Sequence, residues 1–231
     1  MWSIAKLANV LEAGLLQEAS RLEGEQAVYG LDARDELALQ PQLAQVLQDA
    51  GYGVHREERY PAYRKRRRES EGERCDLVLT PGGRPLATPE KSRTLFDPID
   101  AVALQDAFWM EVKVVAQFTT RGPNRRYSSL FGAVRRDIAK LSKEPGISHA
   151  ALLILLFAQD ERIADHDLEV WRSQCRDKGH RLGAPALRGV SVGDRLGNAL
   201  SKLALYPVYH CEPVDAVRVA VDAPARDRYT K

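Results

Sequence analysis

The nine residues from Phe108 to Ala116, Phe-Trp-Met-Glu-Val-Lys-Val-Val-Ala, place two opposite charges inside an otherwise apolar run. Side chains alternate between the two faces of a strand, with roughly 6.6 Å between residues i and i+2. Glu111 and Lys113 therefore project from one face, and Val112 and Val114 from the other. Buried charges are costly unless they are paired or bind a ligand. This run predicts a strand that carries a polar site.

The segment Arg74–Thr80 repeats the pattern one strand earlier. Alternation puts Asp76 and Val78 on one face. The other face carries Cys75, Leu77 and Leu79. If the two strands are neighbours in a sheet, Asp76 comes within reach of Glu111. About 35 residues separate these two acids, which leaves three other partner acids open, although they lie outside any predicted strand: Asp97, Asp100 and Asp106.

Two carboxylates and an ammonium group at one place suit the hydrolysis of a phosphodiester. Carboxylates are hard oxygen ligands for Mg²⁺, and the backbone carbonyl of Val112 could complete the shell. The metal would lower the pKa of a bound water and stabilise charge on the phosphate. Lys113 could orient or deprotonate that water, or offset negative charge. The alternative is a structural Glu111–Lys113 ion pair at a sheet edge.

Helical periodicity predicts helices over residues 3–22 and 34–50, before these strands. The first helix would pack on the domain or on a second copy of the chain. Pro41 would kink the second helix or lie in its first turn. A strand is expected from Val54 to Tyr60. Downstream we expect a helix capped by Ser128, a buried strand over Ala150–Ala158, a helix over residues 164–178, and strands near 203–211 and 217–221. Residues 180–200 are Gly-rich and give no clear prediction.

The order helix, three strands, helix, strand predicts an α/β fold with a mixed central sheet flanked by helices. We interpret residues 1–231 as a single domain. Its expected parts are an N-terminal helical extension over 1–30, a catalytic core over 31–158, and a C-terminal helix and strands over 159–231.

Charge is unevenly distributed, although the net value is only +2. The first 63 residues hold five basic and ten acidic side chains, so the remainder is basic. A basic half is typical of proteins that bind a phosphate backbone. The candidate contacts are Arg64, Lys65, Arg66, Arg67, Arg68, Arg121, Arg125, Arg126, Tyr127, Arg135 and Arg136. The run from Arg64 to Arg68 could equally be a solvated loop, and Tyr127 could stack on a base or pack on the sheet. Asp137 is expected to pair with a nearby arginine.

These segments together resemble the PD-(D/E)XK nucleases, a restriction-endonuclease-like family with an αβββαβ core. The resemblance covers about residues 31–158, with cysteine at position 75 where the family name has proline. It implies that Asp76 and Glu111 bind Mg²⁺, for which Mn²⁺ would substitute, and that Lys113 is the catalytic lysine. It also implies DNA rather than RNA as substrate, a role in restriction, anti-phage defence or repair, and a homodimer or accessory proteins as partners.

Glu36 is a further candidate metal ligand, because many members of that family carry an acid on the first helix. It shares a helical face with Leu43 and Leu47. The alternative is an exposed glutamate favoured by the helix dipole. Glu58 is a weaker candidate. The His166–Asp167 pair is interpreted as a helix start.

Some classes of protein are excluded by composition. No apolar run reaches the length of a membrane span, and no secretory signal is seen, so a cytoplasmic location without membrane contact is expected. The three cysteines show no Cys-x-x-Cys spacing, which argues against a zinc site. Besides a nuclease, the pattern also fits a non-catalytic nucleic-acid-binding or assembly protein that keeps the fold.

Overall fold

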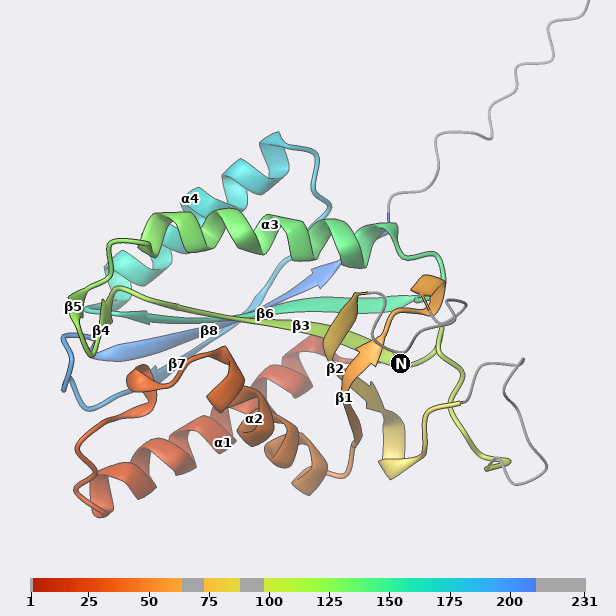
Figure 1. Cartoon of the computed structure of the whole chain (residues 1–231), viewed down its shortest axis with the longest axis horizontal. Helices are drawn as coiled ribbons and strands as arrows, with labels where there is room; N and C mark the ends of the chain where they lie inside the picture. The colour runs from red at the N-terminus through yellow and green to blue at the C-terminus, as the bar shows by residue number, and fades with distance from the viewer. Residues whose placement is uncertain (1, 64–72, 88–97, 211–231) are drawn as a thin grey trace, which may run out of the picture.

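The computed structural model describes residues 2–63, 73–87 and 98–210, and shows a mixed β-sheet between two layers of helices (Figure 1). The predicted α/β class with a mixed sheet flanked by helices is confirmed. The basic run Arg64–Arg68, Asp97 and the strand expected near 217–221 lie outside the described residues.

Apart from one strand, Ala186–Ser191, and a small hairpin after the strand Phe108–Ala116, the elements follow the expected order. The helices are α1 (Ile4–Gly24), α2 (Glu36–Asp49), α3 (Tyr127–Lys143) and α4 (Glu161–Asp177), with short 3-10 turns η1 (Leu31–Ala33), η2 (Pro61–Tyr63) and η3 (Pro81–Gly83). The main strands are β1 (Gly53–Arg59), β2 (Arg74–Thr80), β3 (Phe108–Ala116), β6 (His149–Ala158), β7 (Ala186–Ser191) and β8 (Leu200–Val208). The two-residue strands β4 (Phe118–Thr119) and β5 (Gly122–Pro123) form a small hairpin.

Six strands in the described ranges form one sheet in the order β1-β2-β3-β6-β8-β7. The central pair β3 and β6 is parallel, with Glu111 opposite Leu152 and Lys113 opposite Ile154. Helix α3 provides the crossover that a parallel pair requires. The other pairs are antiparallel. The strand with the two charges therefore lies in the middle of the sheet.

Each face of the sheet is covered by two helices, α1 and α2 on one side and α3 and α4 on the other (Figure 1). On β3, Met110 and Val112 pack into the α1–α2 layer, whereas Trp109 and Val115 pack into the α3–α4 layer. The alternation predicted for this strand is thus observed. Glu111 and Lys113 belong to the face that α3 covers.

The alternation predicted for β2 is wrong at one residue. Leu77 and Leu79 pack into the α1–α2 layer as expected, but Cys75 packs with Val78 on the opposite face. The break falls at Asp76. The residue across from it, Glu57 of β1, has a φ of 55°, a left-handed conformation that non-glycine residues rarely adopt. The two strands are therefore distorted where Asp76 turns toward β3.

Helix α1 packs within the chain. Its apolar stripe of Leu7, Ala8, Leu11, Leu15 and Leu22 is buried, against α2, β7 and β8. The side chain of Arg188 on β7 donates to Asn9 and pairs with Glu12 on α1. Of the two alternatives for this helix, packing on the domain is the one observed.

Helix α2 shows that one of the two alternatives for Pro41 is wrong. Asp35 caps this helix by accepting from the Ala38 N–H, and Pro41 lies beyond the first turn. Its missing N–H leaves the Leu37 carbonyl without a helical donor. Leu37 is exposed, so water can take that place.

Two helix starts and one strand further along the chain differ from expectation. Helix α3 begins at Tyr127 after Arg126, so Ser128 lies inside the helix and does not cap it. Helix α4 begins at Glu161, capped by Asp160, so the His166–Asp167 pair is not a helix start. Strand β7 occupies part of the Gly-rich segment for which no element was predicted. In the residues that are described, no helix is long and apolar enough to span a membrane.

Candidate active site

The sheet opens between β2 and β3 at the two predicted acids. These strands pair from Leu79–Phe108 to Leu77–Met110, and the next step of the same register would set Asp76 opposite Glu111. The ladder stops there. Instead, the Asp76 carboxylate accepts the backbone N–H of Val112 at 2.7 Å. The side chain of Asp76, in place of its backbone, therefore bonds to β3. The carboxyl groups of Asp76 and Glu111 meet where the two strands separate.

Glu111 is buried, with 2% of its surface exposed, and Asp76 is 8% exposed. Burial and then the charge of Asp76 raise the pKa of Glu111 to about 9. Around neutral pH this carboxyl group therefore holds a proton. The proton on Glu111 relieves the repulsion between the two buried acids. A bound metal cation would relieve the same repulsion in its place.

Tyr60 connects Glu111 to its surroundings. Its hydroxyl donates to Glu111 Oε1 at 2.6 Å, and its ring stacks on Trp109 with centroids 5.5 Å apart. Burial raises the pKa of the Tyr60 phenol, and the nearby acidic groups add to this effect. Tyr60 thus remains a neutral donor, and its hydrogen bond favours the ionised form of Glu111.

We expect Tyr60→Phe to raise the pKa of Glu111 by about one unit, because a donor to the carboxylate is lost. The measurement is a ¹³C NMR titration of the glutamate carboxyl carbons in EDTA. Tyr52→Phe is the matched control, since Tyr52 packs near Trp2 with no hydroxyl hydrogen bond to the described residues. An unchanged Glu111 titration in Tyr60→Phe would contradict this account of the site.

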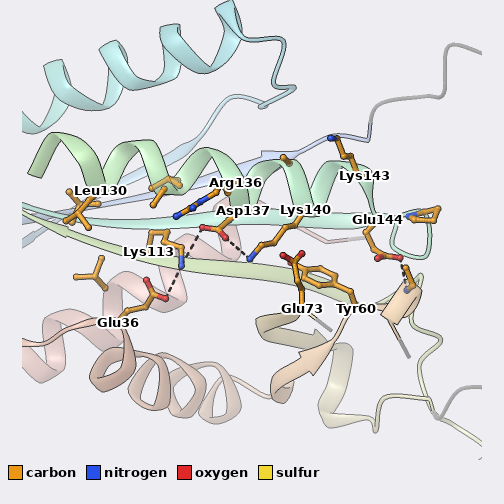
Figure 2. A pocket seen from close by; sticks show the side chains of 17 residues that line it. Glu36, Tyr60, Glu73, Lys113, Leu130, Arg136, Asp137, Lys140, Lys143 and Glu144 are labelled. Atoms are coloured by element: carbon orange, nitrogen blue, oxygen red, sulfur yellow. Dashed lines mark hydrogen bonds and ion pairs between the residues drawn. The ribbon is translucent and has the colours of Figure 1, made fainter. Parts of the chain in front are cut away.

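Lys113 lies in a network of acids from two helices (Figure 2). Its Nζ is 2.9 Å from Glu36 Oε1 on α2 and 3.6 Å from Asp137 Oδ2 on α3. Burial acts to lower the pKa of Lys113, but the charges of Asp137, Glu36 and Asp76 outweigh it and raise the pKa overall. The lysine is therefore a cation suited to offsetting negative charge, and less suited to removing a proton from water.

Glu36 and Asp137 hold this cation from opposite sides of the opening. Burial raises the pKa of Glu36, against the opposing effect of Lys113. Asp137 is buried and also pairs with Lys140 at 3.0 Å. The predicted pairing of Asp137 with an arginine is wrong, because the helix turns this residue inward toward two lysines. Glu36 contacts Lys113, so in this arrangement it positions the lysine.

A cleft of about 980 Å³ opens along α3, next to these side chains. Its polar lining consists of Glu36, Tyr60, Glu73, Lys113, Arg136, Asp137, Lys140, Lys143 and Glu144. Asp76 and Glu111 are not part of the lining, whereas Tyr60, which contacts Glu111, is. The acid pair therefore lies beneath the cleft, next to Tyr60 and Lys113.

The described residues contain no group of three or more His, Cys, Asp or Glu side chains arranged to hold a metal ion. Two carboxylates nevertheless fit Mg²⁺, which keeps several waters and is usually bound by one or two carboxylates and substrate phosphates. The Val112 N–H contacts Asp76, and the Val112 carbonyl is the third ligand expected from the sequence.

Two of the three alternative acids, Asp100 and Asp106, are described, and neither is at this place. Asp100 and Asp106 lie in the loop before β3, and the Asp106 carbonyl accepts the indole N–H of Trp2. The charge that acts most strongly on Glu111 is that of Asp76.

The structure separates the predicted phosphate contacts. Arg136 lines the cleft, whereas its neighbour Arg135 turns toward α4 and donates to Gln174 Oε1 at 3.2 Å. Arg125 and Arg126 are exposed just before α3. Tyr127 packs edge-on against Phe131, and its hydroxyl donates to Asp167 at 2.6 Å. In this conformation Tyr127 contributes to packing between α3 and α4.

Sequence reasoning missed Tyr60 and Asp137 as members of the site. Asp137 carried a usable signal, because it lies beside Val134, Ile138 and Leu141 on the apolar face of α3. An acid on such a face must find a partner inside the fold. Tyr60 carried none, since a tyrosine at a strand end is ordinary core. Comparisons with family models, curated proteins and solved structures find no match to this chain.

Proposed function

We propose that the chain is a Mg²⁺-dependent nuclease of the PD-(D/E)XK type that hydrolyses phosphodiester bonds, in DNA rather than RNA. The observation that carries the proposal is the meeting of Asp76 and Glu111 at the opening between β2 and β3, with Lys113 on the same face at the cleft. Mn²⁺ is expected to substitute for Mg²⁺.

Asp76, Glu111 and the Val112 carbonyl would hold the metal. When bound there, Mg²⁺ supplies charge stabilisation to a phosphodiester and lowers the pKa of an attacking water. Lys113, kept protonated by Glu36 and Asp137, offsets negative charge that grows on the phosphate. Arg136, Lys140 and Lys143 line the same cleft and are placed to contact the nucleic acid backbone.

The biological setting we propose is restriction, anti-phage defence or repair. The partners we propose are a second copy of the chain or accessory proteins. If this chain forms a homodimer, the contact must use a surface other than the apolar stripe of α1, because that stripe is buried against β7 and β8.

The second candidate is a nucleic-acid-binding protein that keeps the fold without catalysis. It is favoured by the hydrogen bonds that Asp76 and Glu111 already make within the protein. Asp76 is already bonded to the Val112 N–H, and Tyr60 bonds Glu111. A nuclease must bind its metal by replacing the proton on Glu111, whereas a binding protein can keep the pair as it is.

The deciding experiment is cleavage of supercoiled plasmid and of single-stranded DNA, with MgCl₂, with MnCl₂ and with EDTA. We expect cleavage with either metal and none with EDTA. Asp76→Asn, purified in the same way, is expected to be inactive, which controls for contaminating nucleases. Equal cleavage by this variant would contradict the proposal. DNA binding without metal-dependent cleavage would establish the second candidate instead.

A further inference from the structure

A second, smaller pocket lies at the C-terminal end of α4, with a volume of about 300 Å³. It is lined by Arg172, Arg176, His180, Arg181, Leu182 and Tyr209. Three guanidinium groups, an imidazole and a phenol thus surround one concave space, with a single aliphatic side chain. This composition is typical of a site for an anion.

Local structure fixes the walls of this pocket. Arg172 and Arg176 are one helical turn apart, so they share a face of α4. Gly179 then adopts a φ of 77°, and the His180 N–H returns to the Cys175 carbonyl, which ends the helix sharply. The turn brings His180 and Arg181 beside the two helical arginines.

The opposite wall is held by backbone pairing. Leu182 forms a bridge with Val208, and the Tyr209 N–H donates to the Arg181 carbonyl at 3.0 Å. A Cβ on Gly183 would lie 2.8 Å from both Pro207 Cγ and the Tyr209 hydroxyl oxygen, so these two residues pack closely over the glycine. The fold therefore fixes the backbone on both sides of the pocket, and the exposed side chains of Arg176, Arg181 and Tyr209 line it.

The positive charge here is poorly compensated. Over residues 2–63, 73–87 and 98–210, one ion pair involves these arginines, between Arg172 and the exposed Glu169 at 3.7 Å. An exposed pair at that distance is weak. Burial lowers the pKa of His180, and the positive charges of Arg135, Lys178 and Lys143 lower it further. Burial and the neighbouring positive charges thus both favour the neutral form of the imidazole.

Lys143 is near both the cleft and this second pocket. It lines the cleft at the end of α3, and its charge also acts on His180. Figure 2 shows it at the end of α3, well apart from the Glu36–Lys113 pair. Arg135, which turns toward α4, adds to the field between the two places. Basic side chains of α3 thus lie both on the side of the cleft and on the side that faces α4.

We propose that the pocket at the end of α4 binds a phosphate group of a nucleic acid strand. Arginines provide the planar donors that phosphate oxygens prefer, and Tyr209 and His180 can donate as well. The pocket would hold a strand at a point beyond the cleft. This inference does not depend on the metal-dependent chemistry proposed above, because it concerns binding alone.

The test follows the His180 imidazole by NMR in the full chain without metal. Inorganic phosphate is expected to raise the His180 pKa by about one unit, because an anion favours the protonated form. The remaining histidine signals are internal controls. If phosphate leaves the His180 titration unchanged, or shifts all histidines equally, the proposal is wrong.

Variants then test the affinity for nucleic acid. We expect the double variant Arg176→Gln, Arg181→Gln to bind a single-stranded oligonucleotide about tenfold more weakly. The double variant Lys6→Gln, Arg162→Gln is the matched control, because it removes two exposed basic side chains outside this pocket, and it should bind as the wild type does. Equal losses in both would indicate general charge attraction and overturn the proposal.

Oligonucleotides with and without a 5′-phosphate distinguish a terminal phosphate from a backbone phosphodiester as the bound group. A loss seen only with a 5′-phosphorylated strand assigns the pocket to a terminal phosphate. Equal losses with and without that group assign it to a backbone phosphodiester. These are binding measurements without metal, so failed cleavage would not affect them. Conversely, an intact nuclease with unchanged binding in the double variant would refute the pocket alone.

Discussion

Lys113→Ala is expected to reduce metal-dependent DNA cleavage by roughly 10²–10³-fold, the usual effect of removing one group that stabilises developing charge. Lys113 projects from the same face of β3 as Glu111, and the surrounding acids keep it protonated. Its loss removes the positive charge from the place where a phosphate would become more negative. Plasmid cleavage under single-turnover conditions measures the effect on the chemical step.

Two controls separate chemistry from folding. Lys113→Ala removes the ion pair with Glu36 and leaves Asp137 paired with Lys140, so thermal unfolding of the variant must be compared with that of the wild type. Lys6→Ala removes an exposed lysine from α1 and should cleave normally. If a folded Lys113→Ala protein cleaves within about tenfold of the wild type, Lys113 has no catalytic role.

Glu111→Gln is expected to have two opposite effects, losing metal binding and gaining stability at high pH. The pKa of Glu111 in the folded protein is about 9, above its ordinary value of 4.5. Folding therefore favours the protonated acid. This contribution is fully present below about pH 4.5 and is lost as the pH rises through about 9. Glutamine imitates the protonated form at every pH.

Urea unfolding in EDTA at about pH 6 and about pH 9 tests this expectation. The wild type should lose roughly 2–4 kcal/mol over this interval relative to Glu111→Gln, on the scale of 1.4 kcal/mol per unit of pKa difference. Adding Mg²⁺ at the higher pH should restore stability to the wild type alone. Glu169→Gln, at an exposed position of α4, should follow the wild type. Parallel pH curves for wild type and Glu111→Gln would contradict the buried acid pair.

The strands were the most predictable part of this fold. Arg74–Thr80 and Phe108–Ala116 were expected with the bounds observed, because each is an apolar run that ends at turn-forming or polar residues. The shared face of Glu111 and Lys113 follows from strand periodicity alone. Strand β7 could not be predicted, since its pattern is weak and it is stabilised by β8 and α1.

The sequence predicted which residues form the site better than it predicted the contacts between them. Periodicity places Asp76 in a strand, but it cannot show that the carboxylate replaces a ladder partner and bonds the Val112 N–H. That outcome depends on the distortion opposite Glu57 and on where the two strands part. Likewise, Asp137 reaches Lys113 because α3 crosses above β3, which is a property of the tertiary packing.

The packing of α1 has a consequence for the order of events during synthesis. The hydrogen bond between Asn9 and Arg188 joins residues that are 179 positions apart. A ribosome delivers the first helix long before β7 and β8, which cover its buried leucines. Helix α2 follows at once, but the part of the α1 stripe that β7 and β8 cover stays exposed for most of translation, a situation that favours chaperone binding and aggregation. Fragments that end before β7 would remain in that state permanently.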